Sequence, residues 1–313
     1  MDSDSDDRKA AWSRYWSSGH TENIFGNSRT NLERFWLGFV MAFPRGGRLL
    51  DLATGSGHVA RLALRCGDGM RLGLEVTGVD YADIANARTL PATPQHCGLT
   101  LTGKVRIEAL PFADASFDGV VSQFGIEYAD LAPTATEIAR VLKPGGRGLF
   151  VLHHKDSAIT AMTGARLAAR REVLGDAPFA QARALFEALA RGERGDEMET
   201  ALRDRVAVMR TRLGAGFQYE NVAQTVGFLG MLADTPAQYD PHDALAKIAA
   251  AIADSTAWEA RQRAQVDAAL DDAGIGRWIA EFRRHGIGAE PPLVIANEAR
   301  VALGWRLAIR KGG

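Results

Sequence analysis

Residues 48–64 combine the residue types and spacing best suited to ligand chemistry. An apolar run ends in Asp51, Gly55 and Gly57 follow, and an alanine- and leucine-rich stretch then predicts a helix. Glycine lets a backbone turn approach a ligand closely, because any Cβ there would collide with it. A carboxylate just before the turn disfavours a pyrophosphate and favours a ligand that carries positive charge. We therefore expect a site for a partly cationic ligand at this strand–turn–helix junction.

The same glycines also fit the dinucleotide pattern G-x-G-x-x-G/A, which would end at Ala60. Asp80 lies about 20 residues beyond them, where an acid that binds a ribose belongs in such a site. A nicotinamide-dependent reductase is therefore an alternative interpretation of this segment. That interpretation leaves Asp51 unexplained, and we expect it to be the weaker one.

Two later blocks carry further motifs. Leu110-Pro-Phe is followed by Ser116-Phe-Asp118, and Leu142-Lys-Pro-Gly-Gly146 marks a helix end, a tight turn and a buried strand. Together with the glycine turn and Asp80, these motifs resemble in order and approximate spacing the class I S-adenosylmethionine-dependent methyltransferases. The likeness is greatest to the small-molecule group that includes the ubiquinone/menaquinone C-methyltransferases. The resemblance covers residues 48–153 and implies S-adenosylmethionine as the cofactor.

The resemblance also implies a role for each matching residue of the cofactor site. Gly55 and Gly57 would lie under the methionine part of the cofactor, with Asp51 close to its amino group. Asp80 would accept hydrogen bonds from the two ribose hydroxyls, a bidentate contact that a neutral side chain copies poorly. The other implied cofactor contacts come from side chains that follow strands: Tyr81 near the adenine, and Gln123 and Phe124 on the sulfonium side.

The sequence departs from the family pattern at two positions. Ala53 replaces the usual first glycine of the loop, which is tolerated if φ is negative there. Arg106 stands where many members of the family carry an aspartate that contacts the adenine amine. We therefore expect Glu108, or backbone groups such as those of Ala109, to contact the adenine instead.

The hydrophobic pattern predicts an α/β fold. We expect a Rossmann-like methyltransferase sheet that is mostly parallel and ends in an antiparallel hairpin formed by 291–296 and 302–310. A loop is expected near 92–100 and a helix near 257–285. The remaining expected elements are strands near 48–52, 74–79, 103–107, 117–122 and 147–153, and helices near 57–66, 82–90 and 133–142.

Residues 156–255 show helical patterns and no convincing strand, so they predict an all-helical insertion that caps the catalytic face. Its helices are expected at 158–174, 178–191, 196–213, 220–232 and 241–254. The methyltransferase core would then consist of 44–155 and 256–313. Residues 1–43 would form an N-terminal tail, with an acidic and disordered opening, followed by two lid helices.

Composition excludes several classes of function. The chain has 313 residues, 46% of them hydrophobic, and a net charge of −1, so no basic field would attract nucleic acid. No apolar run approaches the ~20 residues that span a bilayer. The two cysteines predict neither a disulfide framework nor a metal site, and a cytoplasmic location fits them. No pattern indicates an oligomeric state.

Methyl transfer needs an aligned, desolvated acceptor, and a general base only where the acceptor must lose a proton. His153 and His154 follow the fifth expected strand, and side chains alternate along a strand, so at most one of them should face the pocket. A histidine there is either a base or a hydrogen-bonded residue that anchors the insertion. Tyr128 is a further catalytic candidate or a packing residue. Because of the histidines, O-methylation is slightly preferred to C-methylation.

The acceptor is expected to be a small and partly apolar molecule. Tyr15, Trp16 and His20 surround a polar link between aromatic-rich helices, so we predict that they line its pocket. A protein that binds the cofactor without catalysis and uses the helical insertion as a partner surface is a second alternative. An enzyme should have an acceptor cavity beside the sulfonium, whereas a binding protein should show an exposed apolar patch on the insertion.

Overall fold

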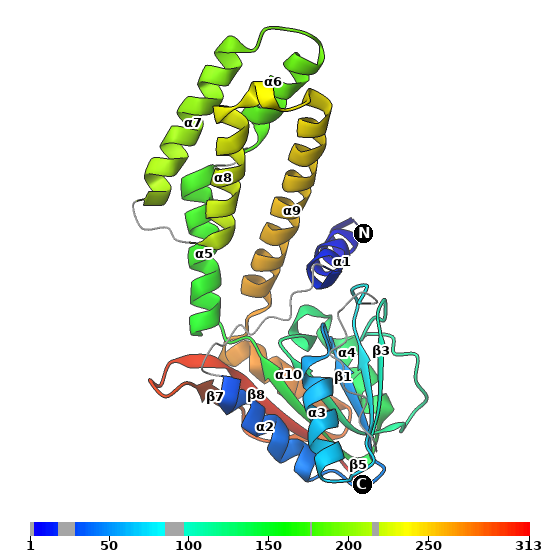
Figure 1. The fold of residues 1–313 in the computed structure, drawn as a ribbon. Helices are drawn as coiled ribbons and strands as arrows, with labels where there is room; N and C mark the ends of the chain where they lie inside the picture. Colours follow the sequence, from blue (N-terminus) through cyan, green and yellow to red (C-terminus); the bar gives the residue numbers. More distant parts are fainter. Residues whose placement is uncertain (1–2, 18–28, 85–96, 176, 215–218) are drawn as a thin grey trace. The chain divides into compact units, whose positions relative to one another are not determined.

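The computed structural model describes residues 3–17, 29–84, 97–175, 177–214 and 219–313. The chain divides into two compact units, one made of Met1–Ala161 and Ala264–Gly313 and the other of Met162–Arg263. The first unit contains the sheet, and the second consists of helices (Figure 1). The domain boundaries expected from the motifs, at 43, 155 and 255, stay a prediction.

The sheet has eight strands in the order β3-β2-β1-β4-β5-β8-β6, with β7 also paired to β8. Strands β1 to β5 pair with one another in parallel, and β8 is antiparallel to β5, β6 and β7. This confirms the predicted α/β fold with a mostly parallel sheet and a terminal antiparallel hairpin. The strands are β1 Arg48–Leu52, β2 Glu75–Val79, β3 Gly98–Thr102, β4 Phe117–Gln123, β5 Leu142–Leu152, β6 Ile287–Ala289, β7 Leu293–Ala296 and β8 Ala302–Lys311.

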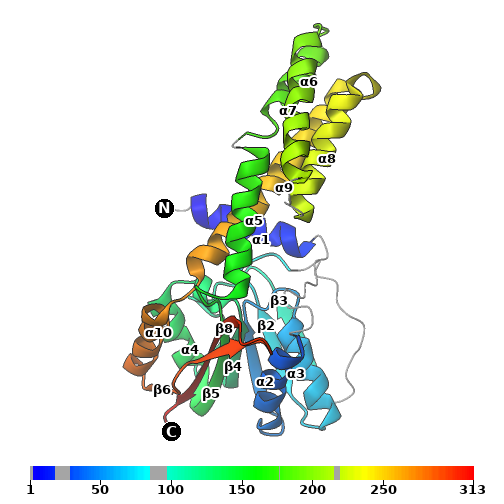
Figure 2. The same cartoon turned by 90° about the vertical axis from the view of Figure 1, so that its left-hand side faces the viewer.

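Helices cover both faces of this sheet, as Figure 2 shows. Side chains alternate between the faces of a strand, so Leu49 packs with α2 (Arg29–Met41) and α3 (His58–Gly69). Leu50 points to the opposite face, where α4 (Leu131–Val141) and α10 (Asp272–Arg284) complete a second apolar core. An apolar core on each face therefore fixes the parallel strands, whose carboxyl ends all lie at the same end of the sheet.

Several expected element boundaries are wrong. The fifth strand begins at Leu142 rather than near 147, so it includes the segment that was expected to form a tight turn. The third strand is Gly98–Thr102 rather than 103–107, because the chain turns at Lys104 (φ 62), whose N–H donates to the carbonyl of Ala82. The loop expected near 92–100 therefore ends before Gly98, where β3 begins, while 85–96 lie outside the described residues, as does most of the helix expected at 82–90. The N-terminal helix α1, Ser3–Ser17, already begins in the acidic opening that was expected to be disordered.

The helix expected at 257–285 is two helices. Helix α9 runs from Pro241 to Ala268, and α10 begins at Asp272. The break occurs because Leu270 bonds to the end of β5: its N–H donates to His153, and its carbonyl accepts from Lys155. The Asp271 carboxylate then caps α10 by accepting from the Gly274 N–H at 2.8 Å.

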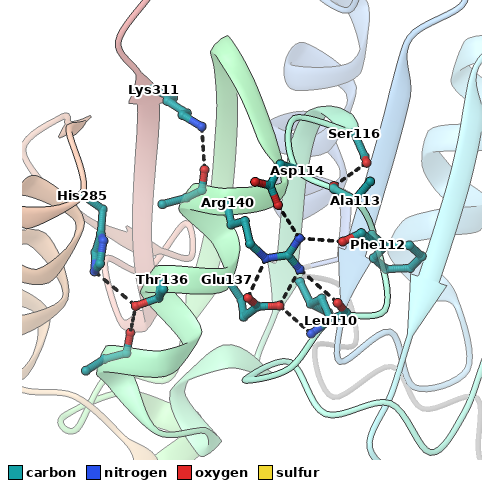
Figure 3. A network of polar contacts seen from close by, with 12 residues as sticks. Leu110, Phe112, Ala113, Asp114, Ser116, Thr136, Glu137, Arg140, His285 and Lys311 are labelled. Carbon is teal, nitrogen blue, oxygen red and sulfur yellow. Dashed lines mark hydrogen bonds and ion pairs between the residues drawn. The ribbon is translucent and has the colours of Figure 1, made fainter.

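Arg140 on α4 fixes the segment that leads from β3 to β4 (Figure 3). Its guanidinium donates to the carbonyls of Leu110 and Phe112 and to the carboxylates of Asp114 and Glu137. The Arg140 hydrogen bond lowers the pKa of Glu137, which also accepts from the Leu110 N–H at 2.6 Å. The Leu110-Pro-Phe motif is thus held against α4 by charge-assisted hydrogen bonds.

The helical unit has an apolar core of its own, which includes Phe186, Leu202 and Leu229. Within the described ranges, no helix of the chain is long and apolar enough to cross a membrane. The helices that contribute to this unit are α5 Ala158–Leu174, α6 Ala180–Ala190, α7 Asp196–Gly214, α8 Glu220–Asp234 and part of α9.

Candidate functional site

The glycine turn after β1 uses left-handed backbone at three positions. Gly55 and Gly57 have φ of 52° and 78°, which glycine adopts without strain. Ala53 has φ of 51°, so the condition under which alanine is readily tolerated there, a negative φ, is not met. Its Cβ packs against Gly125, where an added Cβ would lie only 2.4 Å away. The turn therefore keeps a strained alanine in place of the family glycine.

Asp51 lies under the turn and is 1% exposed. Its Oδ2 accepts from Thr54 Oγ1 at 2.6 Å and from the Ala60 N–H at 3.1 Å. Burial raises the pKa of Asp51 to about 7 despite these hydrogen bonds. No basic side chain of the described residues contributes to its pKa, so the carboxylate is buried without a positive partner.

Asp80 follows β2 and joins it to the turn. One carboxylate oxygen accepts from the Gly55 N–H and the other from the Ala82 N–H, each at 2.8 Å. Burial raises the pKa of Asp80 to about 6. Each oxygen keeps a second lone pair, so the carboxylate is still able to accept two hydroxyl donors.

Aromatic side chains of α1 cover this region. A Cβ added to Gly55 would lie 2.4 Å from the indole of Trp16, so Trp16 packs directly on the turn. Trp12 stacks on Trp16 at 6.2 Å between ring centroids and meets Tyr128 edge-on at 5.8 Å. Tyr15 also contacts Trp16, at 4.8 Å. The structure thus brings the predicted residues Tyr15, Trp16 and Tyr128 into one aromatic cluster, whereas His20 lies outside the described residues.

The residues expected to contact an adenine are grouped around Tyr81, which directly follows Asp80. The Tyr81 ring has the ammonium of Lys9 at 5.1 Å and the guanidinium of Arg106 at 5.5 Å from its centroid. Glu108 lies 3.7 Å from Arg106 in an ion pair. Ala109 donates its N–H to the carbonyl of Arg106 at 3.2 Å. These contacts order the segment, and the adenine roles of its residues stay a prediction.

Gln123 is the last residue of β4 and Phe124 follows it, and their side chains have different surroundings. The Gln123 amide oxygen accepts from the indole N–H of buried Trp36 at 2.8 Å, which ties this side chain to α2. Phe124 has φ of 55°, a strained backbone for a bulky residue, and its ring lies 4.4 Å from the ring of His153. Strain at Phe124 therefore turns an aromatic ring toward the first residue after β5.

His153 and His154 have separate surroundings. His153 is buried, and its Nδ1 lies 2.7 Å from the carboxylate of Glu127, which follows β4. His154 stacks on Trp305 at 4.5 Å and accepts from the Asp156 N–H at 2.9 Å. His154 therefore shapes the turn after β5, and His153 is the histidine that packs with Phe124 and Tyr128.

Sequence reasoning missed three residues of this site. Glu127 is an acid in a short 3-10 helix just after β4, and no local pattern in the sequence places it beside His153. Trp12 precedes Trp16 by one helical turn, so the spacing places both rings on one face. Thr54 lies inside the turn itself and offers a hydroxyl to Asp51. In the ranges described, no three metal-binding side chains group together.

Comparison with known proteins agrees with this geometry. Residues 50–150 match the family described as a methyltransferase domain. The ubiquinone/menaquinone biosynthesis C-methyltransferase UbiE of Geobacter sulfurreducens is 37% identical over 112 residues, which are 35% of this chain and 43% of that protein. The UbiE protein of Geotalea daltonii is 33% identical over 123 residues, or 37% of this chain and 51% of its own. The chain thus spans about half the length of these curated relatives.

Solved structures of methyltransferases are also similar to this chain. A SAM-dependent methyltransferase from Methanosarcina mazei is 14% identical with a TM-score of 0.41, over 88% of this chain and 96% of its own. Geranyl diphosphate C-methyltransferase from Streptomyces coelicolor, solved with S-adenosyl-L-homocysteine, is 22% identical with a TM-score of 0.32, over 39% of this chain and 43% of its own.

The sheet unit is a class I S-adenosylmethionine-dependent methyltransferase domain, as the motifs predict. Its cofactor is S-adenosylmethionine. The residues present fit this molecule, because a buried carboxylate without a positive partner, Asp51, suits its ammonium group. Asp80 suits the two ribose hydroxyls, and the left-handed glycines allow close approach of the backbone.

Proposed function

We propose that this chain transfers a methyl group from S-adenosylmethionine to a hydroxyl oxygen of a small, partly apolar acceptor. The observation that carries the proposal is the pair of buried carboxylates beside the glycine turn. Asp51 and Asp80 have pKa values raised to about 7 and about 6, which is a cost for the fold alone. A ligand that brings a positive charge and hydroxyl donors offsets this cost.

The acceptor would lie at the carboxyl ends of β4 and β5. Phe124, Tyr128 and Trp12 supply aromatic surface there, which favours an acceptor with an apolar face. The imidazole of His153 is a group that would accept the proton of an acceptor hydroxyl. We assign α1 the role of a lid that takes part in acceptor selection, because its Trp12 and Trp16 pack on Tyr128 and on the glycine turn.

Two other functions are weighed against this one. The printed names of relatives and of a similar structure describe C-methyltransferases, so transfer to carbon is the second candidate. A protein that binds the cofactor without catalysis is the third. Identification of the methylated atom separates the first two, and absence of turnover with retained cofactor binding favours the third.

The first experiment is calorimetric titration of the purified chain with S-adenosylhomocysteine, with NADH as a control ligand. Replacement of Asp80 by Ala should weaken nucleoside binding about 100-fold or more, because two hydrogen bonds to a charged group are lost. Asp114→Asn is the matched control, since Asp114 is an exposed acid of the same unit that pairs with Arg140.

The outcomes of this titration are distinct. Binding of S-adenosylhomocysteine that is lost in Asp80→Ala and kept in Asp114→Asn supports the proposed cofactor site. Acceptors are then screened with a labelled methyl donor. Binding of NADH instead, or equal binding by Asp80→Ala and the wild type, would overturn the proposal.

A further inference from the structure

Glu127 and His153 form a buried pair between the ends of two neighbouring parallel strands. Glu127 lies in the 3-10 helix Ile126–Tyr128 after β4, and His153 is the first residue after β5. One carboxylate oxygen, Oε1, accepts from the His153 backbone N–H at 2.9 Å and faces Nδ1 at 2.7 Å. The two side chains are 0% and 2% exposed. The imidazole is therefore held from two directions by one acid.

This geometry constrains the histidine proton. A carboxylate without a proton only accepts hydrogen bonds, so beside it a neutral imidazole would donate from Nδ1 and keep its lone pair on Nε2. Among the described residues, Nε2 of His153 and Oε2 of Glu127 are buried and have no hydrogen-bond partner. A buried polar atom without a partner destabilises a fold by about 1–3 kcal/mol. A ligand hydroxyl would supply the hydrogen bond that Nε2 lacks.

The surroundings of the imidazole indicate the shape of that ligand. The Phe124 ring lies 4.4 Å from the imidazole and is tilted by 44°, and Tyr128 meets the imidazole edge-on at 5.7 Å. Burial, with a smaller contribution from Glu127, raises the pKa of Tyr128 well above its usual value. Flat rings around one lone pair suit a planar aromatic molecule that carries a hydroxyl.

The pair also lies beside the cofactor turn. Gly125 precedes Glu127 by two residues and packs against Ala53 of the turn. On the other side, Tyr128 contacts Trp12, which stacks on Trp16 over Gly55. One continuous set of contacts therefore joins the turn to the histidine.

We propose that His153 accepts the proton of an aromatic hydroxyl during methyl transfer and that Glu127 positions the imidazole for this step. The inference rests on the proposed function, since the bound cofactor supplies the electrophilic methyl group. The hydroxyl O–H bond breaks and its proton goes to Nε2. The oxygen forms a bond to the methyl carbon as the carbon–sulfur bond breaks, and the sulfur keeps that electron pair. Glu127 balances the imidazolium charge until the proton leaves to solvent.

The probe for this inference is 4-nitrophenol, added to the full chain together with S-adenosylhomocysteine. Its absorbance distinguishes phenol from phenolate. Wild type should shift the bound probe toward phenolate, whereas His153→Gln and Glu127→Gln should not. His285→Gln is the matched control, because His285 follows α10 directly, lies beside Thr136 and is outside this site. Binding of the probe only as neutral phenol, or no binding of it by a wild type saturated with S-adenosylhomocysteine, would overturn the inference.

Two further readouts separate a positioning role from a merely structural one. Nitrogen-15 spectra of wild type should show His153 protonated at Nδ1, and Glu127→Gln should lose that preference; protonation at Nε2 in wild type contradicts the assignment. With a labelled methyl donor and 4-nitrophenol, kcat should fall about 10²–10⁴-fold in His153→Gln, while affinity for S-adenosylhomocysteine is kept. Label on a ring carbon refutes the hydroxyl assignment, and failure of S-adenosylhomocysteine itself to bind refutes the proposed function instead.

Discussion

The sheet unit and the helical unit treat charge in opposite ways. In the sheet unit, Asp51 and Asp80 are buried at the carboxyl ends of β1 and β2, and no basic side chain of the described residues contributes to their pKa. In the helical unit, several ion pairs outside the apolar core face solvent. Arg183 and Glu187, for example, pair at 2.7 Å with side chains 63% and 41% exposed.

This difference indicates where selection for function acts. Burial of an unpaired carboxylate raises its pKa and costs stability, so it persists where a ligand uses it. Exposed pairs around an apolar core are what a stable helical unit needs without any ligand. We therefore assign the proposed methyl transfer to the sheet unit, and variants of the two units should separate stability from binding.

The largest expected effect is on the stability of the helical unit. Phe186 is fully buried in its core, so Phe186→Ala should lower the free energy of unfolding by about 3–5 kcal/mol. Urea unfolding followed by circular dichroism measures this loss, with Phe186→Leu as the milder control. Affinity for S-adenosylhomocysteine should stay at the wild-type value. A parallel loss of affinity would show that the two units are energetically coupled, so that stability and binding would not be separate properties of the two units.

The next effect is on ligand binding by the sheet unit. Because burial raises the pKa of Asp51 to about 7, the free protein holds a proton there at lower pH, and a ligand ammonium must displace it. Affinity for S-adenosylhomocysteine should therefore be greatest above pH 7 and fall about tenfold per pH unit below it. Calorimetry from pH 5 to 8 measures the slope. Asp51→Asn should bind more weakly at pH 8 and show a shallower slope; an unchanged slope would contradict the role of Asp51.

The third effect is a gain of stability from the same substitution. The pKa of Asp51 is above its unfolded value of 3.8, so its contribution is most favourable below pH 4 and is lost as pH rises to about 7. Without ligand at pH 8, the free energy of unfolding of Asp51→Asn should be about 1–3 kcal/mol higher than that of wild type. Denaturant unfolding measures this difference. The difference should vanish near pH 4. An equal or lower stability of the variant at pH 8 would mean that the buried carboxylate is not a cost.

The motifs predicted the cofactor side of the site because its determinants are local. Asp51 and the glycines lie within one strand–turn–helix, and Asp80 ends the next strand, so short-range pattern places all of them. The parallel strands β1, β2 and β4 were predicted for the same reason. Their apolar residues are buried, and in β1 Leu49 and Leu50 enter apolar cores on opposite faces of the sheet.

The acceptor side depends on contacts that no local pattern contains. Glu127 and His153 are 26 residues apart and meet only because β4 and β5 pair in parallel. Trp12 reaches Tyr128 only through the placement of α1. The third strand was misplaced because the turn at Lys104 is fixed by backbone bonds to the loop after β2. Tertiary pairing, rather than propensity, decides these features.

The smallest expected effect tests the surface of the helical unit. Arg183 precedes Glu187 by one helical turn, the less favourable order for such a pair, and both side chains are largely in solvent. A double-mutant cycle with Arg183→Gln and Glu187→Gln should give a coupling of about 0.3 kcal/mol, which 1 M salt should abolish. Urea unfolding of the four proteins measures it. Water screens this exposed pair, whereas the carboxylate of Asp51 is buried. A coupling energy as large as the stability gain expected from Asp51→Asn would therefore mean that burial does not distinguish the charges of the two units.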